Sequence, residues 1–220
     1  MLEDSRINNK WPFAKEGFPF IFTGLCLTLV FLYLGLVLTS IVAGMLTLFV
    51  MFFFRDPDRQ NDVHHHAVFA PADGRILEVK RFYEGNNPLG KPGHRISIFM
   101  SVFNVHVNRI PVAGTIKKIV YQPGKFFSAN LDKASEQNES NIITLETRDL
   151  HNIVFIQIAG LIARRIACWI EEADCVEAGQ RFGLIRFGSR LEIYLPDDTI
   201  ITTQKGQKVK AGATVIGNLP

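Results

Sequence analysis

The chain has 220 residues, a formal net charge of +3 and a mean hydropathy of +0.14. This length is enough for one domain with its own core plus an appendage. A charge this small, without a basic run that alternates with aromatic residues, excludes a typical nucleic-acid-binding protein. The three cysteines form neither a metal-ligand pattern nor an even set for a disulfide framework, which is typical of a reducing compartment.

The first predicted element is an apolar segment, residues 17–54, which contains no charged residue. As one straight helix, residues 19–54 would be roughly 54 Å long, whereas the hydrocarbon core of a bilayer is about 30 Å thick. We therefore expect a membrane hairpin of two short spans that turns near Gly35 or Ser40; one tilted helix with an interfacial extension is the alternative. Basic residues flank the segment on both sides, so the positive-inside rule places both ends in the cytoplasm. They are Arg6, Lys10 and Lys15 before it, and Arg55 and Arg59 after it.

The remainder of the chain is predicted to be mainly β, because short alternating runs are bounded by Gly, Pro and Asn. Residues 1–16 precede the hairpin, residues 55–63 form a polar linker, and residues 64–220 form a β-rich domain. One short amphipathic helix is expected at 160–173, and the polar segment 128–140 is expected to be a loop that covers a site. The expected strands are 75–83, 95–109, 115–121, 142–148, 152–159, 182–195 and 208–216.

A weak internal repeat lies near the C-terminus, where VEAGQRFG (176–183) and VKAGATVIG (209–217) share V-x-A-G followed by a glycine. Such turns are common in flattened β-barrels and sandwiches of the lipoyl-domain kind, so the repeat favours a lipoyl-like architecture. It also raises the alternative of a non-catalytic, membrane-tethered adaptor or carrier. A lipoyl carrier needs an exposed lysine at a hairpin tip, but here Lys210 precedes the Ala-Gly step and its counterpart is Glu177.

Two residues of the β-rich domain are candidates for acid–base chemistry. Asp73 in FAPADGRI fits an ordinary Asp-Gly turn, and it would be functional if a histidine lay opposite it. The run FNVHVNRIP supplies His106 on a polar stripe with Asn104 and Asn108, which suggests a cleft. Histidine moves protons near neutral pH, and an aspartate bonded to its second ring nitrogen would fix its tautomer. A satisfied structural histidine is the alternative.

Two further clusters have a chemical and a structural interpretation. The run HHH (64–66) is expected to bind no metal, because adjacent side chains point in different directions and zinc sites need spaced ligands. Arg164 and Arg165 could hold a phosphate through paired hydrogen bonds. They could equally form a solvated helix face.

The segment IRFGSRLEIYLP (185–196) contains a Gly-Ser step inside an alternating strand pattern. Alternation places Ser189 on the apolar face with Leu191 and Ile193. One interpretation is a small core residue whose hydroxyl bonds nearby backbone. The other is a buried nucleophile beside Gly188, which leaves the backbone free to twist.

Taken together, these motifs resemble the phosphatidylserine decarboxylase family in its short bacterial and archaeal form. The resemblance covers residues 55–196 and is most specific in its last two segments. The segments that carry it are RDPDR, PADGRI, FMSVFNVHVNRIPVAGTI, QPGKF, QIAGLIARRI and GQRFGLIRFGSRLEIYLP.

The resemblance implies a proenzyme that cuts itself between Gly188 and Ser189. Ser189 would attack the carbonyl of Gly188 to give an ester; elimination would then split the chain, and loss of ammonia would convert Ser189 to a pyruvoyl group. This covalent cofactor would form a Schiff base with the amine of phosphatidylserine and release carbon dioxide and phosphatidylethanolamine. The two self-cleaved chains would stay associated at the inner membrane, with the catalytic domain on the cytoplasmic side. A homodimer is left open.

The resemblance also implies roles for individual residues. Asp73 and His106 would be the acid–base pair, and Arg164, Arg165 and Lys125 are candidates for the lipid phosphate. Longer members of the family carry a second histidine three positions after the first, where this chain has Arg109. The roles that two histidines share in those members are therefore not assigned to this chain. His106 would serve in both self-cleavage and decarboxylation, or one histidine of 64–66 would contribute. At the cleavage site the long form has LGST and this chain has FGSR.

Overall fold

The protein is described by a computed structural model that covers residues 7–59, 66–83, 87–124, 137–160, 166–186 and 189–220. It contains two compact units. One is helical, Asn9–Asp58, and we call it the helical unit. The other runs from Arg59 to the C-terminus, together with the residues before Asn9, and we call it the β unit.

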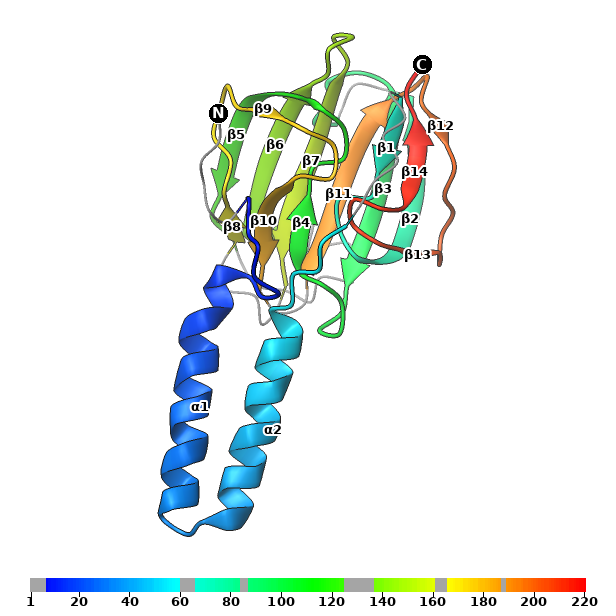
Figure 1. The fold of residues 1–220 in the computed structure, drawn as a ribbon. Helices are drawn as coiled ribbons and strands as arrows, with labels where there is room; N and C mark the ends of the chain where they lie inside the picture. Colours follow the sequence, from blue (N-terminus) through cyan, green and yellow to red (C-terminus); the bar gives the residue numbers. More distant parts are fainter. Residues whose placement is uncertain (1–6, 60–65, 84–86, 125–136, 161–165, 187–188) are drawn as a thin grey trace. The chain divides into compact units, whose positions relative to one another are not determined.

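The helical unit is a hairpin of two apolar helices (Figure 1). A single 3-10 turn, η1 (Lys15–Gly17), leads into α1 (Phe18–Tyr33), and α2 (Val37–Phe53) follows. The chain reverses at Gly35, whose φ of +72° favours glycine, whereas Ser40 lies inside α2. The segment from Lys15 through α1 is long and apolar enough to cross a membrane, and α2 is a shorter apolar helix.

The surface of these helices is apolar, which is the reverse of a water-soluble hairpin. Phe22 is 70% exposed and Leu38 is 77% exposed. The helices approach closely at Gly24, because a Cβ there would lie 2.4 Å from the hydroxyl of Thr47. Small residues at such a crossing are typical of helices that pack in lipid.

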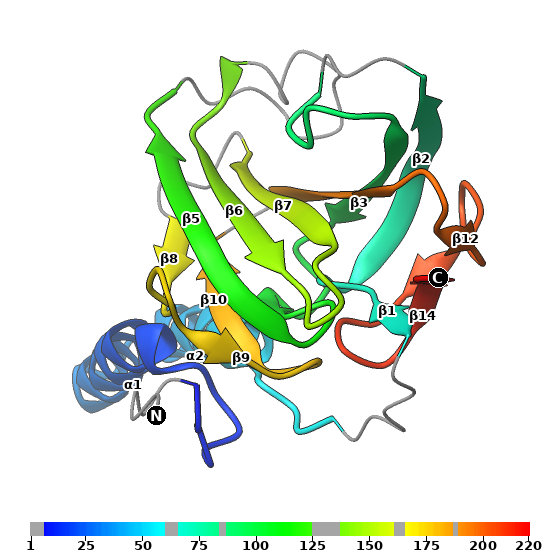
Figure 2. The ribbon, with the colours of Figure 1, turned by 90° about the horizontal axis from the view of Figure 1, so that it is seen from above.

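The β unit is built around one curled antiparallel sheet (Figures 1 and 2). Its eight strands have the order β13-β2-β3-β11-β7-β6-β5-β9, and two small sheets, β1-β14-β12 and β4-β10-β8, complete the unit. The predicted mainly β fold with an N-terminal helical hairpin is confirmed. The strands are β1 (Ala67–Phe69), β2 (Gly74–Phe82), β3 (Gly93–Met100), β4 (Val107–Arg109), β5 (Gly114–Gln122), β6 (Ser140–Glu146), β7 (Asn152–Ala159), β8 (Ile166–Cys168), β9 (Cys175–Val176), β10 (Arg181–Ile185), β11 (Ser189–Pro196), β12 (Ile200–Ile201), β13 (Lys208–Val209) and β14 (Val215–Asn218).

Several segments differ from the sequence-based expectation. The helix expected at 160–173 is wrong in its described part, because Ile166–Cys168 forms β8 and pairs with β10. A short helix would leave many of its backbone N–H and C=O groups without hydrogen-bond partners, whereas β10 supplies partners for β8. Strand pairing therefore outweighs the local helical pattern of the sequence. The expected strands 95–109, 182–195 and 208–216 are each interrupted and form two strands. Most of the expected loop 128–140 lies outside the described residues, and Ser140 begins β6.

The β unit contains the same backbone arrangement twice. In repeat A, β2 pairs with β13 and β1 pairs with β14; in repeat B, β5 pairs with β9 and β4 pairs with β10. The repeats exchange reciprocal hydrogen bonds, from the Phe69 amide to the Pro111 carbonyl at 2.8 Å and from the Arg109 amide to the Pro71 carbonyl at 2.9 Å. Repeat A therefore carries P-A-D-G where repeat B carries P-V-A-G.

Further backbone bonds confirm the equivalence of the two repeats. The Ile76 amide donates to the Gln207 carbonyl at 2.9 Å in repeat A, and the Ile116 amide donates to the Asp174 carbonyl at 2.9 Å in repeat B. The register of each long strand shifts once, directly after these isoleucines. The V-x-A-G repeat found in the sequence is the C-terminal part of this larger duplication.

Candidate active site

The chemically suggestive residues meet at one edge of the large sheet. Asp73 directly precedes β2, β3 ends at Met100, and Ser189 begins β11. Because neighbouring strands are antiparallel, the start of β2, the end of β3 and the start of β11 lie at the same edge. The sheet topology thus brings together residues that are more than a hundred positions apart in the chain.

Ser189 is fully buried, as its alternation pattern predicted. It lies between Met100 on β3 and Ala159 on β7. Its hydroxyl donates to the sulfur of Met100 at 3.8 Å. A thioether is a weak acceptor, so this contact leaves the hydroxyl available for a stronger partner. Gly188, on the other side of the expected cleavage bond, lies outside the described residues.

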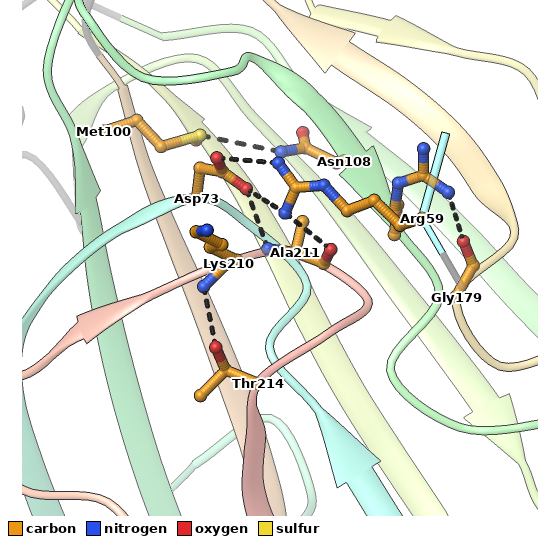
Figure 3. Close-up of polar contacts among 9 residues, drawn as sticks. Arg59, Asp73, Met100, Asn108, Gly179, Lys210, Ala211 and Thr214 are labelled. Atoms are coloured by element: carbon orange, nitrogen blue, oxygen red, sulfur yellow. Dashed lines mark hydrogen bonds and ion pairs between the residues drawn. The ribbon is translucent and has the colours of Figure 1, made fainter. Parts of the chain in front are cut away.

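A chain of buried amides ends at the same sulfur. Asn108 donates to the sulfur of Met100 at 3.6 Å, Gln157 donates to the Asn108 carbonyl oxygen at 2.9 Å, and Asn141 donates to the Gln157 carbonyl oxygen at 3.1 Å. These bonds fix the Asn108 amide so that its N–H groups face the sulfur of Met100 (Figure 3). Ser189 contacts the same sulfur. The polar stripe around His106 pointed to Asn108. For Gln157, the available signal was a polar residue inside an apolar strand. Asn141 lies near the start of β6 beside other polar residues, so the sequence carried no such signal for it.

Asp73 is held by an arginine and a backbone amide (Figure 3). The guanidinium of Arg59 contacts both carboxylate oxygens, at 2.7 and 2.9 Å, and the Ala211 amide donates to one of them at 2.8 Å. Arg59 also donates to the Ala211 carbonyl at 2.9 Å. Both side chains are about nine-tenths buried, so these charge-assisted bonds fix the carboxylate firmly. From the sequence, Arg59 counted only as one of the basic residues that flank the hairpin.

His106 is fully buried and directly precedes β4. Its backbone carbonyl accepts a hydrogen bond from the Ile185 amide of β10 at 3.4 Å. Among the described residues, no hydrogen bond joins its ring to Asp73 or to the Ser189 hydroxyl. The expected acid–base pair therefore stays a prediction.

Arg109, which takes the place of a second histidine, is a buried structural residue. Its guanidinium donates to the Gly179 carbonyl of repeat B at 2.9 Å. Its stem lies against Gly212 of repeat A, where an added Cβ would come within 2.8 Å of the Arg109 Cδ. Both glycines have positive φ, +79° and +64°. Arg109 thus joins the equivalent turns of the two repeats.

The opposite face of β11 carries a buried charged cluster. Arg190 and Glu192 form an ion pair at 2.7 Å, and each side chain is at most 2% exposed. Arg190 also donates to the Ser97 hydroxyl at 3.0 Å, and the Tyr194 hydroxyl donates to Glu192 at 3.0 Å. Burial and the adjacent Glu192 carboxylate raise the pKa of Tyr194. The cluster fixes β11 directly after Ser189.

Several expected site residues lie outside the described residues: His64, His65, Lys125, Arg164 and Arg165. Within the described part of the chain, no group of three or more His, Cys, Asp or Glu side chains could hold a metal ion.

Comparison with known proteins gives matches over nearly the whole chain. The family model for phosphatidylserine decarboxylase matches residues 46–217, which include Asp73, His106 and Ser189. A phosphatidylserine decarboxylase proenzyme of Syntrophus aciditrophicus is 48% identical over 205 residues, 93% of this chain and 96% of the relative. The proenzyme of Desulfotalea psychrophila is 45% identical over 213 residues, 94% of this chain and 97% of the relative. That of Pelobacter propionicus is 46% identical over 219 residues, 96% of this chain and 99% of the relative.

Proposed function

The chain belongs to the phosphatidylserine decarboxylase family and is a carboxy-lyase, and from this premise we propose that it converts phosphatidylserine to phosphatidylethanolamine and carbon dioxide. We propose further that it first cuts its own backbone between Gly188 and Ser189 and converts Ser189 to a pyruvoyl group. The observation that carries this proposal is the buried position of Ser189 at the first residue of a central strand.

The surroundings of Ser189 fit a pyruvoyl group. The site is buried and mostly apolar, with Met100 and Ala159 on either side and the Asn108 amide close to the same sulfur. Burial protects a reactive carbonyl from competing water. Once formed, the group supplies an electron sink for the carbon that loses the carboxylate.

Self-cleavage is proposed to use the hydroxyl of Ser189 as the nucleophile. Its oxygen forms an ester bond to the carbonyl carbon of Gly188 while the peptide C–N bond breaks, and the serine nitrogen takes up a proton. Elimination then releases residues 1–188 with a C-terminal carboxylate. Water completes the conversion of residue 189, with loss of ammonia. We assign the proton transfers to Asp73 and His106, and we assign Asn108 to hydrogen bonding of a carbonyl oxygen near Ser189.

The two cleaved chains are expected to stay together without any new contact. β11 pairs with β3 on one side and with β7 on the other, and its Leu191 and Ile193 side chains are fully buried. Cleavage before the first residue of the strand leaves all of these contacts in place. The small chain, residues 189–220, would therefore remain part of the sheet.

The apolar hairpin is proposed to tether the enzyme to the inner membrane. Its substrate stays in a bilayer, so a tether raises the concentration of lipid near the site. The flanking basic residues support the proposal that both ends of the hairpin, and hence the β unit, lie on the cytoplasmic side.

Intact mass spectrometry of the full-length protein beside Ser189→Ala tests this function. We expect two chains from the wild type, the smaller beginning at residue 189 and blocked by a pyruvoyl group, and one chain from the variant. Wild-type protein should release carbon dioxide from phosphatidylserine in micelles. A folded wild type that stays whole and releases none would contradict the proposal and favour the non-catalytic adaptor.

A further inference from the structure

A pocket of about 600 Å³ opens beside Asp73 in repeat A, which lies within the size range of ligand sites. Three of its lining residues are basic: Arg75 at the start of β2, and Lys208 and Lys210 in and after β13. Residues that follow β3, among them Asn104 and the exposed Phe103, complete the wall. We call this the repeat A pocket.

Two of these cations face each other across a strand ladder. Lys208 is the register partner of Arg75. Like charges directly opposite each other in a sheet are destabilising. Among the described residues, none of the three basic side chains forms an ion pair with an acidic residue. The fold therefore retains a repulsive pair that an anion from outside would relieve.

Repeat B supplies an internal control for this arrangement. Its equivalent pocket is smaller, about 270 Å³, and is lined by the corresponding residues Thr115, Cys175 and Glu177. Thr115 and Cys175 occupy the opposed register positions without any charge, and an acidic residue stands where repeat A has Lys210. The backbone arrangement thus does not require basic residues here. Their presence in repeat A alone, beside Asp73, points to binding.

We propose that Arg75, Lys208 and Lys210 bind the phosphate of the lipid headgroup during decarboxylation; this inference rests on the proposed function. Arg75 pairs with Phe99, and Phe99 pairs with Arg190, the residue after Ser189. Two strand spacings of about 4.8 Å each therefore separate Arg75 from the strand that Ser189 begins. Arg75 shares the sheet face of Arg190, whereas Ser189 lies on the other face. The pocket also includes Gly74 and Ser101, which lie where β2 begins and β3 ends, so the headgroup passes around these strand ends to reach Ser189.

The chemistry of the reaction favours the phosphate over the carboxylate as the bound group. The carboxylate loses its charge as carbon dioxide leaves, so cations on it would stabilise the substrate more than the transition state. The phosphate keeps its charge throughout. Cations that bind it contribute equally to both states, so they lower KM and leave kcat unchanged. The pocket cations are additional to Arg164, Arg165 and Lys125, which the sequence suggested.

The first test compares Arg75→Gln/Lys208→Gln with Lys205→Gln in the full-length, self-cleaved enzyme. Lys205 is an exposed cation in the same turn and does not line the pocket, so it is a matched control. Rates on phosphatidylserine in neutral mixed micelles give KM and kcat. We expect KM to rise roughly tenfold in the double variant with kcat within about twofold, and no change in the control. An unchanged KM, or a fall in kcat alone, would overturn the proposal.

Glycerophosphoserine separates headgroup binding from attraction to a charged lipid surface, because it has the same headgroup without acyl chains. It should inhibit the wild type competitively, and its inhibition constant should rise in the double variant by the same factor as KM. Equal inhibition of both proteins would mean that the cations act only on the membrane surface, and the proposal is wrong. Inhibition by inorganic phosphate as strong as that by glycerophosphoserine would also overturn it, because the site would then lack headgroup recognition.

If the double variant fails to cleave itself, its kinetics cannot be measured. Binding of glycerophosphoserine to the uncleaved protein then tests the proposal. Calorimetry with glycerophosphoserine compares Ser189→Ala with Ser189→Ala carrying both pocket substitutions. At least tenfold weaker binding in the latter supports the proposal, and equal binding contradicts it. Failure of the proposed function has a different signature, since wild-type protein would then stay whole or release no carbon dioxide.

Discussion

Repeats A and B have the same backbone arrangement but carry different side chains at equivalent positions. Both have a proline turn before a long strand, a short pairing strand and a glycine of positive φ, and they exchange reciprocal hydrogen bonds. Repeat A adds Asp73 and the opposed cations, whereas repeat B has Ala113 and neutral residues at these positions. Features present in both repeats therefore serve the fold, and features present in repeat A alone are candidates for function.

The two central strands extend the comparison. β11 and β7 occupy equivalent positions in the sheet order and pair with each other. On one shared face β11 carries Arg190, Glu192 and Tyr194, while their partners on β7 are Ile158, Ile156 and Val154. One strand thus buries charge where its neighbour buries hydrocarbon. The charged strand is the one that begins with Ser189.

The largest expected effect comes from making repeat A resemble repeat B at Asp73. Asp73→Asn cannot accept a proton and loses the ion pair with Arg59, so we expect carbon dioxide release to fall at least about a hundredfold. Ala113→Asn is the matched change in repeat B and should keep nearly full activity. Activity assays with intact mass, on both variants, check this. An Asp73→Asn enzyme that cleaves itself and works normally would remove Asp73 from the site.

The next effect concerns the buried charges of β11. Arg190→Met removes the nearest cation from the buried Glu192 carboxylate, whose other cation, Arg95, lies at 3.9 Å, and should lower the free energy of unfolding by about 3 kcal/mol. The double variant Arg190→Met/Glu192→Leu, which makes two of the three positions on this face apolar as on β7, should recover part of this loss. Denaturant unfolding of the uncleaved Ser189→Ala protein provides the measurement. A double variant as unstable as the single one would show that the pair itself stabilises the strand.

A smaller effect is expected at Tyr194, which donates a hydrogen bond to the same carboxylate. Tyr194→Phe should cost about 1.5–3 kcal/mol, the usual contribution of a hydrogen bond to a charged group. Because burial and Glu192 raise the pKa of Tyr194 in the folded state, this stabilisation is present below the unfolded value of about 10 and is lost at higher pH. Stability measured against pH should fall more steeply above that value in the wild type than in Tyr194→Phe.

The smallest effect is expected from an exposed difference between the repeats. Arg81 pairs with Asp197 at 2.6 Å, and its repeat B counterpart is Tyr121. The Arg81 hydrogen bond lowers the pKa of Asp197, so any stabilisation exists above the unfolded pKa and disappears as the pH falls through the folded value. Arg81→Gln should return the Asp197 pKa, followed by NMR, towards its ordinary value. The melting temperature should hardly change, because exposed pairs contribute little.

The sequence by itself determined the features that depend on local pattern. The uncharged length of residues 17–54 favoured two short helices over one tilted helix, with a turn near Gly35 or Ser40. The chain turns at Gly35. Alternation placed Ser189 on a buried strand face, because successive side chains of a strand point to opposite sides. The resemblance of its motifs indicated the family and implied Ser189 as the residue that we propose for self-cleavage.

Only the tertiary structure decided which distant residues meet. The order of strands in the sheet differs from their order in the chain, so sequence pattern could not predict the contact of Arg59 with Asp73 or the amide chain from Asn141 to Asn108. Tertiary structure also decided that residues 166–168 form a strand, because β10 provides hydrogen-bond partners for their backbone. Local periodicity fixes which face a side chain occupies, whereas its neighbours on that face are set by strand pairing.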